Sequence, residues 1–294
     1  MIDGLIAFIL ALIMFGIGLS LQPANFRNLW RQPKVLFLGL CLQLLLLPGL
    51  AITVSFLLDL PPAFAAGVLV LAACPGGLTS NFISYLLRAN TALAVSLTIC
   101  NTALSLITIP FYVNLALRLF EGPAGVTELP LLPTVLTILA IVLAPVALGM
   151  WYRARKPLRG QVLQERLRWL SVGLLALLFC LKVFAPAEAG GSELSWADVR
   201  IILPASVLIN ILALSSGRVF GSLFGYDRDA QLTLGVEVGI QNTSLAFMVT
   251  SGLLGNEEML KPALIYAMFT FFTALFYGYL LKPNALRTLL RPQS

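Results

Sequence analysis

Residues 232–248 read LTLGVEVGIQNTSLAFM, and they lie within an apolar run that is long enough to cross a bilayer. The middle of this run nevertheless carries the carboxylate of Glu237, two amides and two hydroxyls. An acidic side chain at the centre of a membrane helix costs roughly 2.5–3.5 kcal/mol on insertion scales, so it indicates a functional site. Gly235 and Gly239 weaken the helix around the acid. We therefore expect a transmembrane helix that is broken at mid-membrane beside a carboxylate.

The composition of the chain is that of an integral membrane protein. Its 294 residues are 59% hydrophobic and 11% charged, and the mean hydropathy is +0.93. A soluble domain carries about 25% charged residues. Several runs of about 20 apolar residues follow one another, and each is long enough to span a bilayer. We predict an all-α, polytopic membrane protein in which residues 1–294 form one unit of about nine transmembrane helices.

The residue types that are missing or isolated exclude several functions. The chain has no histidine, which excludes His-assisted serine or cysteine catalysis and the HExxH metal motif. A carboxylate dyad needs two acids, and Glu237 is the single acid expected inside the membrane, so we do not expect an enzyme. The four cysteines lie in apolar runs without a CxxC pattern, and they are interpreted as small buried hydrophobic residues rather than disulfide or metal ligands: Cys41, Cys74, Cys100 and Cys180.

A second expected break lies at residues 74–81, which read CPGGLTSN. Proline removes a backbone donor and the two glycines resist helix formation, so the third helix is interrupted there. The nine expected helices cover residues 3–21, 35–58, 63–87, 91–117, 131–152, 169–187, 201–224, 230–254 and 262–281.

The distribution of charge predicts the orientation. With the N-terminus outside, the inner segments hold 15 of the 19 Lys and Arg residues, and nine of the 13 acids lie outside. The positive-inside rule then places the C-terminus in the cytoplasm and requires an odd number of spans. The net charge of +6 fits a basic membrane face rather than nucleic-acid binding. Lys182 is expected to snorkel to the outer surface.

The two broken helices occupy corresponding places in two halves of the chain. Helices two to four and helices seven to nine start from opposite sides, so the halves are inverted repeats, and paired broken helices of this kind indicate a transporter site at the midplane. Thr79 or Ser80 is expected to cap one half-helix, and Asn242 or Thr243 the other. The half-helix N-termini suit an anion, while exposed carbonyls and Glu237 suit a hard cation such as sodium.

The residues at both breaks resemble the two signature motifs of the bile acid:sodium symporter family. These residues are CPGG at 74–77 followed by Ser80 and Asn81, and EVGIQN at 237–242. The resemblance implies sodium-driven uptake of an organic anion by two broken helices that cross. It also implies a core domain, about residues 35–117 and 201–281, that moves against a panel domain, about residues 3–21 and 131–187.

The resemblance assigns two sodium sites residue by residue. The first site corresponds to side chains of the first break, the next helix and the motif acid: Ser80, Asn81, Thr98 and Glu237. The second corresponds to amide, carboxylate and backbone oxygens: Gln43, Glu237, Val238, Ile240 and Gln241. Ala94 replaces a hydroxyl residue that is usual in the first site. The residues assigned to the substrate are Leu78, Thr79, Asn242 and Asn210. Alternatively, Gln43 and Asn210 join helices through amide hydrogen bonds.

The sequence thus predicts a sodium-coupled symporter that imports an organic anion, either bile-acid-like or a small carboxylate such as pantoate or a keto acid. A proton-coupled carrier or an efflux carrier of the same architecture is the alternative. The expected partners are sodium ions, the organic anion and the lipid bilayer of the cell (inner) membrane, with no nucleic acid and no organic cofactor. A monomer is compatible with this architecture.

Overall fold

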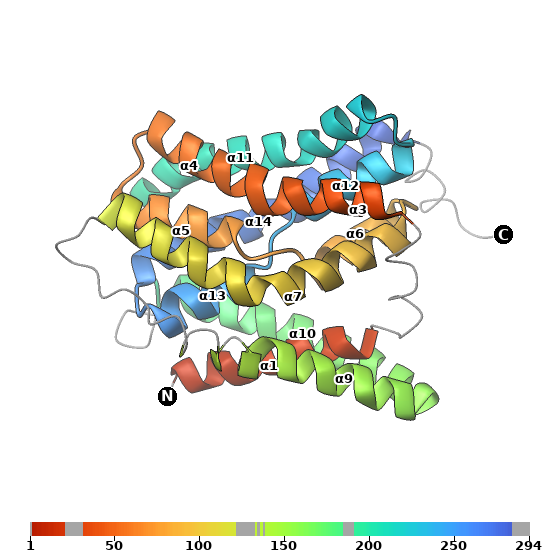
Figure 1. Ribbon diagram of the computed structural model, residues 1–294. Coiled ribbons are helices and arrows are strands. Elements are labelled where there is room, and N and C mark those ends of the chain that lie inside the picture. Colours follow the sequence, from red (N-terminus) through yellow and green to blue (C-terminus); the bar gives the residue numbers. More distant parts are fainter. Residues whose placement is uncertain are drawn as a thin grey trace.

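The protein is all-helical throughout the part of the chain that the structure, a computed structural model, describes (Figure 1). The described residues are 2–20, 32–121, 133, 136–137, 139–184 and 191–283. The helices are α1 (Ile2–Ser20), α3 (Pro33–Cys41), α4 (Leu47–Leu57), α5 (Pro62–Ala72), α6 (Leu78–Leu86), α7 (Thr91–Ala116), α9 (Ala144–Arg155), α10 (Pro157–Phe184), α11 (Trp196–Leu223), α12 (Arg228–Gly239), α13 (Thr243–Phe247) and α14 (Glu257–Leu281). Four π-helical segments extend or join them: η1 (Leu42–Leu46), η2 (Leu117–Glu121), η3 (Leu139–Leu143) and η5 (Met248–Leu253).

Four uninterrupted helices in the described ranges are long and apolar enough to cross a membrane. They cover Pro33–Leu57, Thr91–Glu121, Trp196–Leu223 and Glu257–Leu281. The predicted class, an all-α polytopic membrane protein, is therefore confirmed, whereas the count of nine spans stays a prediction. Large apolar side chains such as Phe37, Ile107 and Phe272 are exposed on these helices, as expected for surfaces that face lipid.

Both predicted helix breaks are present. The first separates α5 from α6, where residues 73–77 leave the helix. The second separates α12 from α13, and Ile240 is extended there, with φ −111° and ψ 119°. In Figure 1, α5 and α6 run from left to right, whereas α12 and α13 run from right to left. The two broken helices therefore run in opposite directions, as inverted repeats require.

The helices form two groups, and α1, α9 and α10 lie at the bottom of Figure 1. One group contains α1, α9 and α10, which pack on one another, and we call it the lower layer. The remaining helices, α3–α7 and α11–α14 with η1, η2 and η5, form the upper layer. Within the lower layer, α1 and α9 approach so closely that a Cβ atom on Gly18 would lie 2.1 Å from the Val146 carbonyl oxygen. Small residues at such contacts let membrane helices pack backbone to backbone.

Three helices begin five or more residues earlier than the sequence predicts. α10 begins at Pro157 rather than at residue 169 and includes most of the basic stretch, because proline suits the first turn and Gln, Glu, Arg and Leu are good helix formers. α11 begins at Trp196 rather than at residue 201, because Ser195 and Asp198 form a capping box. α14 begins at Glu257 rather than at residue 262, because Asn256 caps it.

Candidate functional site

The two helix breaks touch through their backbones. The Asn242 amide donates to the Cys74 carbonyl over 3.1 Å. A Cβ atom on Gly76 would lie 2.5 Å from the Ile240 carbonyl oxygen, so only glycine permits this approach. The broken helices therefore cross at their interruptions, and the side chains of both breaks converge on one buried region.

One of the two predicted helix caps is present. Asn242 caps α13, since its Oδ1 accepts from the Leu245 amide over 3.1 Å. At the other break the N-cap residue of α6 is Gly77, and neither Thr79 nor Ser80 caps the helix. The Ser80 hydroxyl instead donates to the Gly77 carbonyl over 3.0 Å. The prediction of a Thr79 or Ser80 cap was wrong because the chain enters α6 two residues earlier, at Leu78.

A chain of hydrogen bonds joins three of the residues predicted for the first sodium site. Asn81 Nδ2 donates to Thr98 Oγ1 over 3.0 Å, and Thr98 Oγ1 donates to Glu237 Oε2 over 3.2 Å. The fourth residue, Ser80, is fully buried, and its side chain lies near the Glu237 carboxylate. The residues come from α6, α7 and α12, so the fold brings together groups that are 139 residues apart in sequence. We call these four residues the first cluster.

Both ends of this chain carry an oxygen that lacks a hydrogen-bond partner within the described ranges. These buried oxygens are Asn81 Oδ1 and Glu237 Oε1. Buried polar groups are normally paired, so unpaired acceptors in the middle of a bundle indicate a missing ligand. No ion pair of Glu237 with Lys or Arg is found among the described residues. Carboxylate, amide and hydroxyl oxygens are the ligands that hard cations prefer, so the first cluster fits a cation.

The residues predicted for the second sodium site are also brought together, but their polar groups bond one another. Gln43 Nε2 donates to Gln241 Oε1 over 3.0 Å, and Gln241 Nε2 donates to the Val238 carbonyl over 2.7 Å. Gln43 also lies 3.5 Å from the Ala72 carbonyl. Ile240 contributes the carbonyl that faces Gly76. We call Gln43, Val238, Ile240 and Gln241 the second cluster.

A narrow cavity separates the breaks from the lower layer. Its walls come from α1, α7, α9 and both breaks, and they include Met14, Gly77, Thr102, Val146 and Asn242. The space is about 10 Å³, which is room for roughly one water molecule. Asn242, predicted to bind substrate, therefore lies where the two layers meet.

Of the other residues predicted to bind substrate, neither Thr79 nor Asn210 is among the described residues that line the narrow cavity. Thr79 is exposed at the start of α6. The Leu78 side chain lies outside the described residues. Asn210 is buried on the far side of the second break, where its Nδ2 donates to the Gly239 carbonyl and to Tyr266 Oη over 2.8 and 3.1 Å. The structure thus places Asn210 against the backbone of the break rather than in the walls of the narrow cavity.

Sequence reasoning missed two polar contacts. Tyr266, which donates to the Gly239 carbonyl over 2.8 Å, was not singled out, because a tyrosine in an apolar helix is an ordinary finding. The expectation that Lys182 snorkels to the surface was wrong: Lys182 is 2% exposed and its ammonium lies 2.7 Å from Glu257 Oε1. The partly exposed carboxylate of Glu257 stabilises the buried ammonium in place of water.

Two oppositely directed broken helices that cross in a membrane bundle, with a buried carboxylate at the crossing, are typical of secondary transporters. Comparison with known proteins gives the family. Residues 7–190 match the Sodium Bile acid symporter family, and the chain belongs to this family. The predicted family is thereby confirmed.

Relatives with known names are transporters rather than enzymes. The chain is 30% identical over 256 residues to the probable sodium/metabolite cotransporter BASS1, chloroplastic, of Arabidopsis thaliana, covering 87% of this chain and 61% of that protein. It is 29% identical to the uncharacterized sodium-dependent transporter YocS of Bacillus subtilis, covering 83% and 73%. It is 24% identical to the ileal sodium/bile acid cotransporter of Homo sapiens, covering 93% and 78%. The chain thus spans less than two thirds of the plant relative.

Proposed function

We propose that this protein is a sodium-coupled symporter that imports an organic anion by alternating access. The observation that carries the proposal is the first cluster: a buried hydrogen-bond chain from Asn81 through Thr98 to Glu237 that leaves an unpaired oxygen at each end. A cation bound at Glu237 Oε1 would pair this oxygen and neutralise the buried carboxylate. The names of the relatives, which include sodium, support this choice of ion.

Sodium accounts for the surroundings of Glu237 better than a proton does. A proton needs only the carboxylate, whereas a hard metal ion needs several oxygens at once. Asn81, Thr98 and Ser80 supply amide and hydroxyl oxygens from α6 and α7 around the acid of α12. The proton-coupled alternative leaves this gathering of oxygens without a purpose.

The narrow cavity supports alternating access. A space with room for roughly one water molecule is too small for an organic anion, so the lower layer must move away from the breaks to admit one. On this proposal the lower layer is the panel domain and the upper layer is the core domain. The N-terminus lies outside, the C-terminus lies in the cytoplasm, and the protein resides in the cell (inner) membrane.

The substrate in this proposal is an organic anion, bile-acid-like or a small carboxylate such as pantoate or a keto acid. Asn242 supports this class, because it lines the cavity and caps α13, whose N-terminal amides favour negative charge. Thr79 and Leu78 stand at the start of α6, the corresponding half-helix of the other break. Sodium at the neighbouring cluster would draw the two half-helices together and prepare the anion site.

Thermal unfolding of the purified protein in detergent tests the proposal. The unfolding midpoint is compared in sodium, potassium and choline chloride at equal ionic strength, because a ligand that binds only the folded state raises stability by mass action. We expect a sodium-specific rise that is absent in Glu237→Gln and retained in Asp59→Asn, a control at an exposed acid. A wild-type midpoint that follows pH and ignores sodium would instead support the proton-coupled carrier.

A further inference from the structure

The carbonyl of Gly239 is held by two buried side chains from different helices. Tyr266 of α14 donates its hydroxyl to this oxygen over 2.8 Å, and Asn210 of α11 donates its amide over 2.8 Å. The same amide donates to the Tyr266 hydroxyl over 3.1 Å, so the three groups form a closed triangle. Asn210 is 0% exposed and Tyr266 is 2% exposed. We call Asn210 and Tyr266 the carbonyl clamp.

The clamp satisfies an acceptor that the helix break leaves open. Gly239 ends α12, and the amide that would bond its carbonyl in a continuing helix, that of Thr243, bonds the Gln241 carbonyl instead. An unpaired carbonyl is costly in a membrane interior. The two side chains remove this cost, and they also fix the direction in which the Gly239 peptide points.

That direction controls the two neighbouring carbonyls. Val238 and Ile240 supply the backbone oxygens of the second cluster, and Gly239 lies between them. The Gly239 oxygen points to α11 and α14, whereas the Ile240 oxygen lies against Gly76 of the other break. Rotation of the Gly239 peptide would turn both neighbours, because consecutive peptides share the dihedral angles between them.

The surroundings give the break room to relax without the clamp. A cavity of about 10 Å³ lies beside the clamp and is lined by Tyr266, Gln241, Ser206 and Ala72, among others. We propose that Asn210 and Tyr266 are positioning residues for the second cation site, which hold the Val238 and Ile240 carbonyls in the geometry that a sodium ion requires. This inference rests on the proposed function.

A sodium titration of the unfolding midpoint tests the clamp. Tyr266→Phe removes one hydroxyl and keeps the ring, so we expect the half-saturating sodium concentration to rise roughly threefold to tenfold, the effect of one net hydrogen bond. Asn210→Leu should act in the same direction. The matched control is Tyr277→Phe, a buried tyrosine of the same helix whose hydroxyl packs against Gly235 instead, and it should leave the sodium dependence unchanged.

The outcomes separate the clamp from the proposed function. If the wild type shows no sodium-specific rise, the proposed function fails. If the wild type responds and both clamp variants keep its half-saturating concentration, the positioning role is overturned while the proposed function stands. The positioning role is also overturned if the variants lose the same stability in sodium and in potassium and keep the half-saturating sodium concentration. This result is expected of a hydrogen bond that stabilises only the fold. If one of the two clamp variants does not fold, the other one alone still tests the positioning role.

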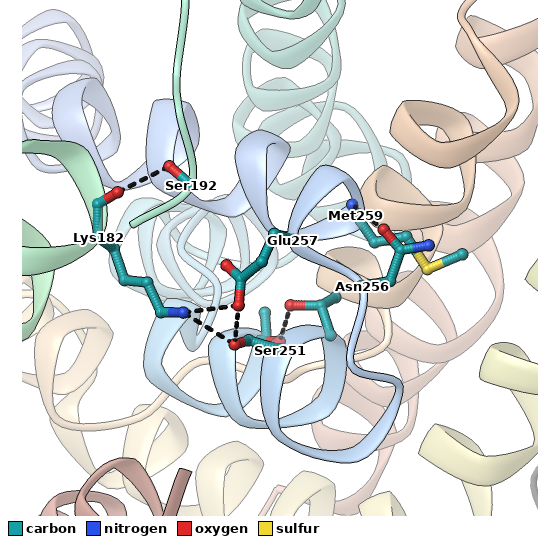
Figure 2. Close-up of polar contacts among 8 residues, drawn as sticks. Lys182, Ser192, Ser251, Asn256, Glu257 and Met259 are labelled. Carbon is teal, nitrogen blue, oxygen red and sulfur yellow. Dashed lines mark hydrogen bonds and ion pairs between the residues drawn. The ribbon is translucent and has the colours of Figure 1, made fainter. Parts of the chain in front are cut away.

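A second inference rests on a different contact, the ion pair between the buried Lys182 and the partly exposed Glu257, which joins the two layers (Figure 2). Lys182 lies near the end of α10, and its ammonium donates to Glu257 Oε1 over 2.7 Å and to Ser251 Oγ over 2.9 Å. Ser251 donates to the same carboxylate oxygen over 2.5 Å. Ser192 bonds the Lys182 carbonyl through both its amide and its hydroxyl over 2.8 Å.

This ion pair joins elements that move apart in the proposed mechanism. Lys182 belongs to the lower layer, whereas Ser251 of η5 and Glu257 of α14 belong to the upper layer. Among the ion pairs found in the described ranges, it alone connects the layers. A buried ammonium without a partner is costly, and Lys182 is 2% exposed. The ion pair therefore favours the closed arrangement, in which the two layers are in contact near Lys182.

We infer that Lys182, Ser251 and Glu257 form a latch that holds the layers in the closed arrangement and opens during each transport cycle. The inference rests on the proposed alternating access. By the predicted orientation the latch lies on the outer side of the membrane. Removing it shifts the population toward arrangements in which the layers are separated there.

Thiol labelling from outside measures the latch. Thr102→Cys places a reporter in the narrow cavity, in a background that lacks Cys41, Cys74, Cys100 and Cys180. Lys182→Met should raise the labelling rate by a membrane-impermeant maleimide roughly tenfold, the effect of losing a bond to a charged group. Lys261→Met is the matched control, because this lysine is also buried but pairs with Asp198 and Glu258 inside the upper layer.

Two further variants make the result decisive. Glu257→Gln should act like Lys182→Met, and the double exchange Lys182→Glu with Glu257→Lys should return the rate toward that of the wild type. Unchanged labelling in both single variants would overturn the latch. A rise that also occurs in Lys261→Met would overturn it too, because the effect would then follow from general loosening. Labelling needs no sodium, so this outcome is independent of the proposed coupling ion.

Discussion

The two clusters at the helix crossing differ in how their oxygens are paired. In the first cluster, hydrogen bonds run in one direction from Asn81 to Glu237 and leave an acceptor free at each end within the described residues. In the second, Gln43 and Gln241 bond each other, and Gln241 also occupies the Val238 carbonyl over 2.7 Å. The same crossing therefore carries one open cluster of acceptors and one closed cluster.

This difference has a consequence for ion binding. A cation can enter the first cluster without breaking any bond of the described residues. In the second cluster, the amide of Gln241 already donates to the Val238 carbonyl, so a cation there competes with this bond, and each bond that is weakened offsets part of the binding free energy. We therefore expect the first cluster to determine the affinity for sodium and the second to respond when the break changes shape.

The largest expected effect is that of Thr98→Val, which removes the central link of the first cluster and keeps the shape of the side chain. The half-saturating sodium concentration for thermal stabilisation should rise roughly tenfold to a hundredfold, because hydrogen bonds to charged groups are the strong ones. The measurement is a sodium titration of the unfolding midpoint at constant ionic strength.

Thr102→Val is the control for Thr98→Val. Thr102 lies one turn further along α7 and lines the same narrow cavity, but it is not part of the hydrogen-bond chain from Asn81 to Glu237. The control variant should retain the sodium dependence of the wild type. An unchanged titration in Thr98→Val would show that the first cluster is not the site that determines affinity.

A smaller effect is expected from Gln43→Leu in the second cluster. Loss of this amide should raise the half-saturating sodium concentration only roughly threefold to tenfold. It should also lower the unfolding midpoint in potassium chloride, because Gln241 loses its buried hydrogen-bond partner whether or not sodium is present. The same titration measures both quantities.

Gln231→Leu is the matched control for Gln43→Leu, because Gln231 donates to the Tyr226 carbonyl at the other end of α12. If Gln43→Leu weakened sodium binding more than Thr98→Val, the order of the two clusters would be reversed. The second cluster would then bind sodium more tightly than the first. The hydrogen bonds between its amides would be present only when no ion is bound.

The breaks could be predicted from the sequence because local chemistry determines them. Proline and glycines at 75–77, and a carboxylate between glycines at 235 and 239, oppose a continuous membrane helix whatever surrounds them. The helices that begin at Pro157, Trp196 and Glu257 extend beyond the predicted apolar spans, because the charged and polar residues beside these spans favour helix or cap it.

The contacts that depend on packing could not be predicted in this way. The bonds of Lys182 to Ser251 and Glu257 join residues 69 and 75 positions apart, and no local pattern marks that pairing. Tyr266 and Asn210 meet Gly239 from two other helices. The gathering of Asn81, Thr98 and Glu237 was expected only through the family resemblance, which supplied the long-range information that periodicity lacks.

The smallest expected effect is that of Ala94→Ser, which probes whether the first cluster is complete. Ala94 is fully buried and precedes Thr98 by one turn of α7, so a hydroxyl there would point toward the same cluster. We expect the half-saturating sodium concentration to fall roughly threefold, the lower end of the effect of one hydrogen bond. The added atom in a packed site should lower the midpoint in potassium slightly.

Ala103→Ser, at an exposed position of α7, should leave the titration as it is in the wild type, which separates the added ligand from a general effect of serine in this helix. An unchanged affinity in Ala94→Ser, measured beside this control, would mean that Asn81, Thr98, Ser80 and Glu237 already complete the coordination of the ion. The open acceptors of the first cluster would then be enough by themselves, and the contrast with the second cluster would become sharper.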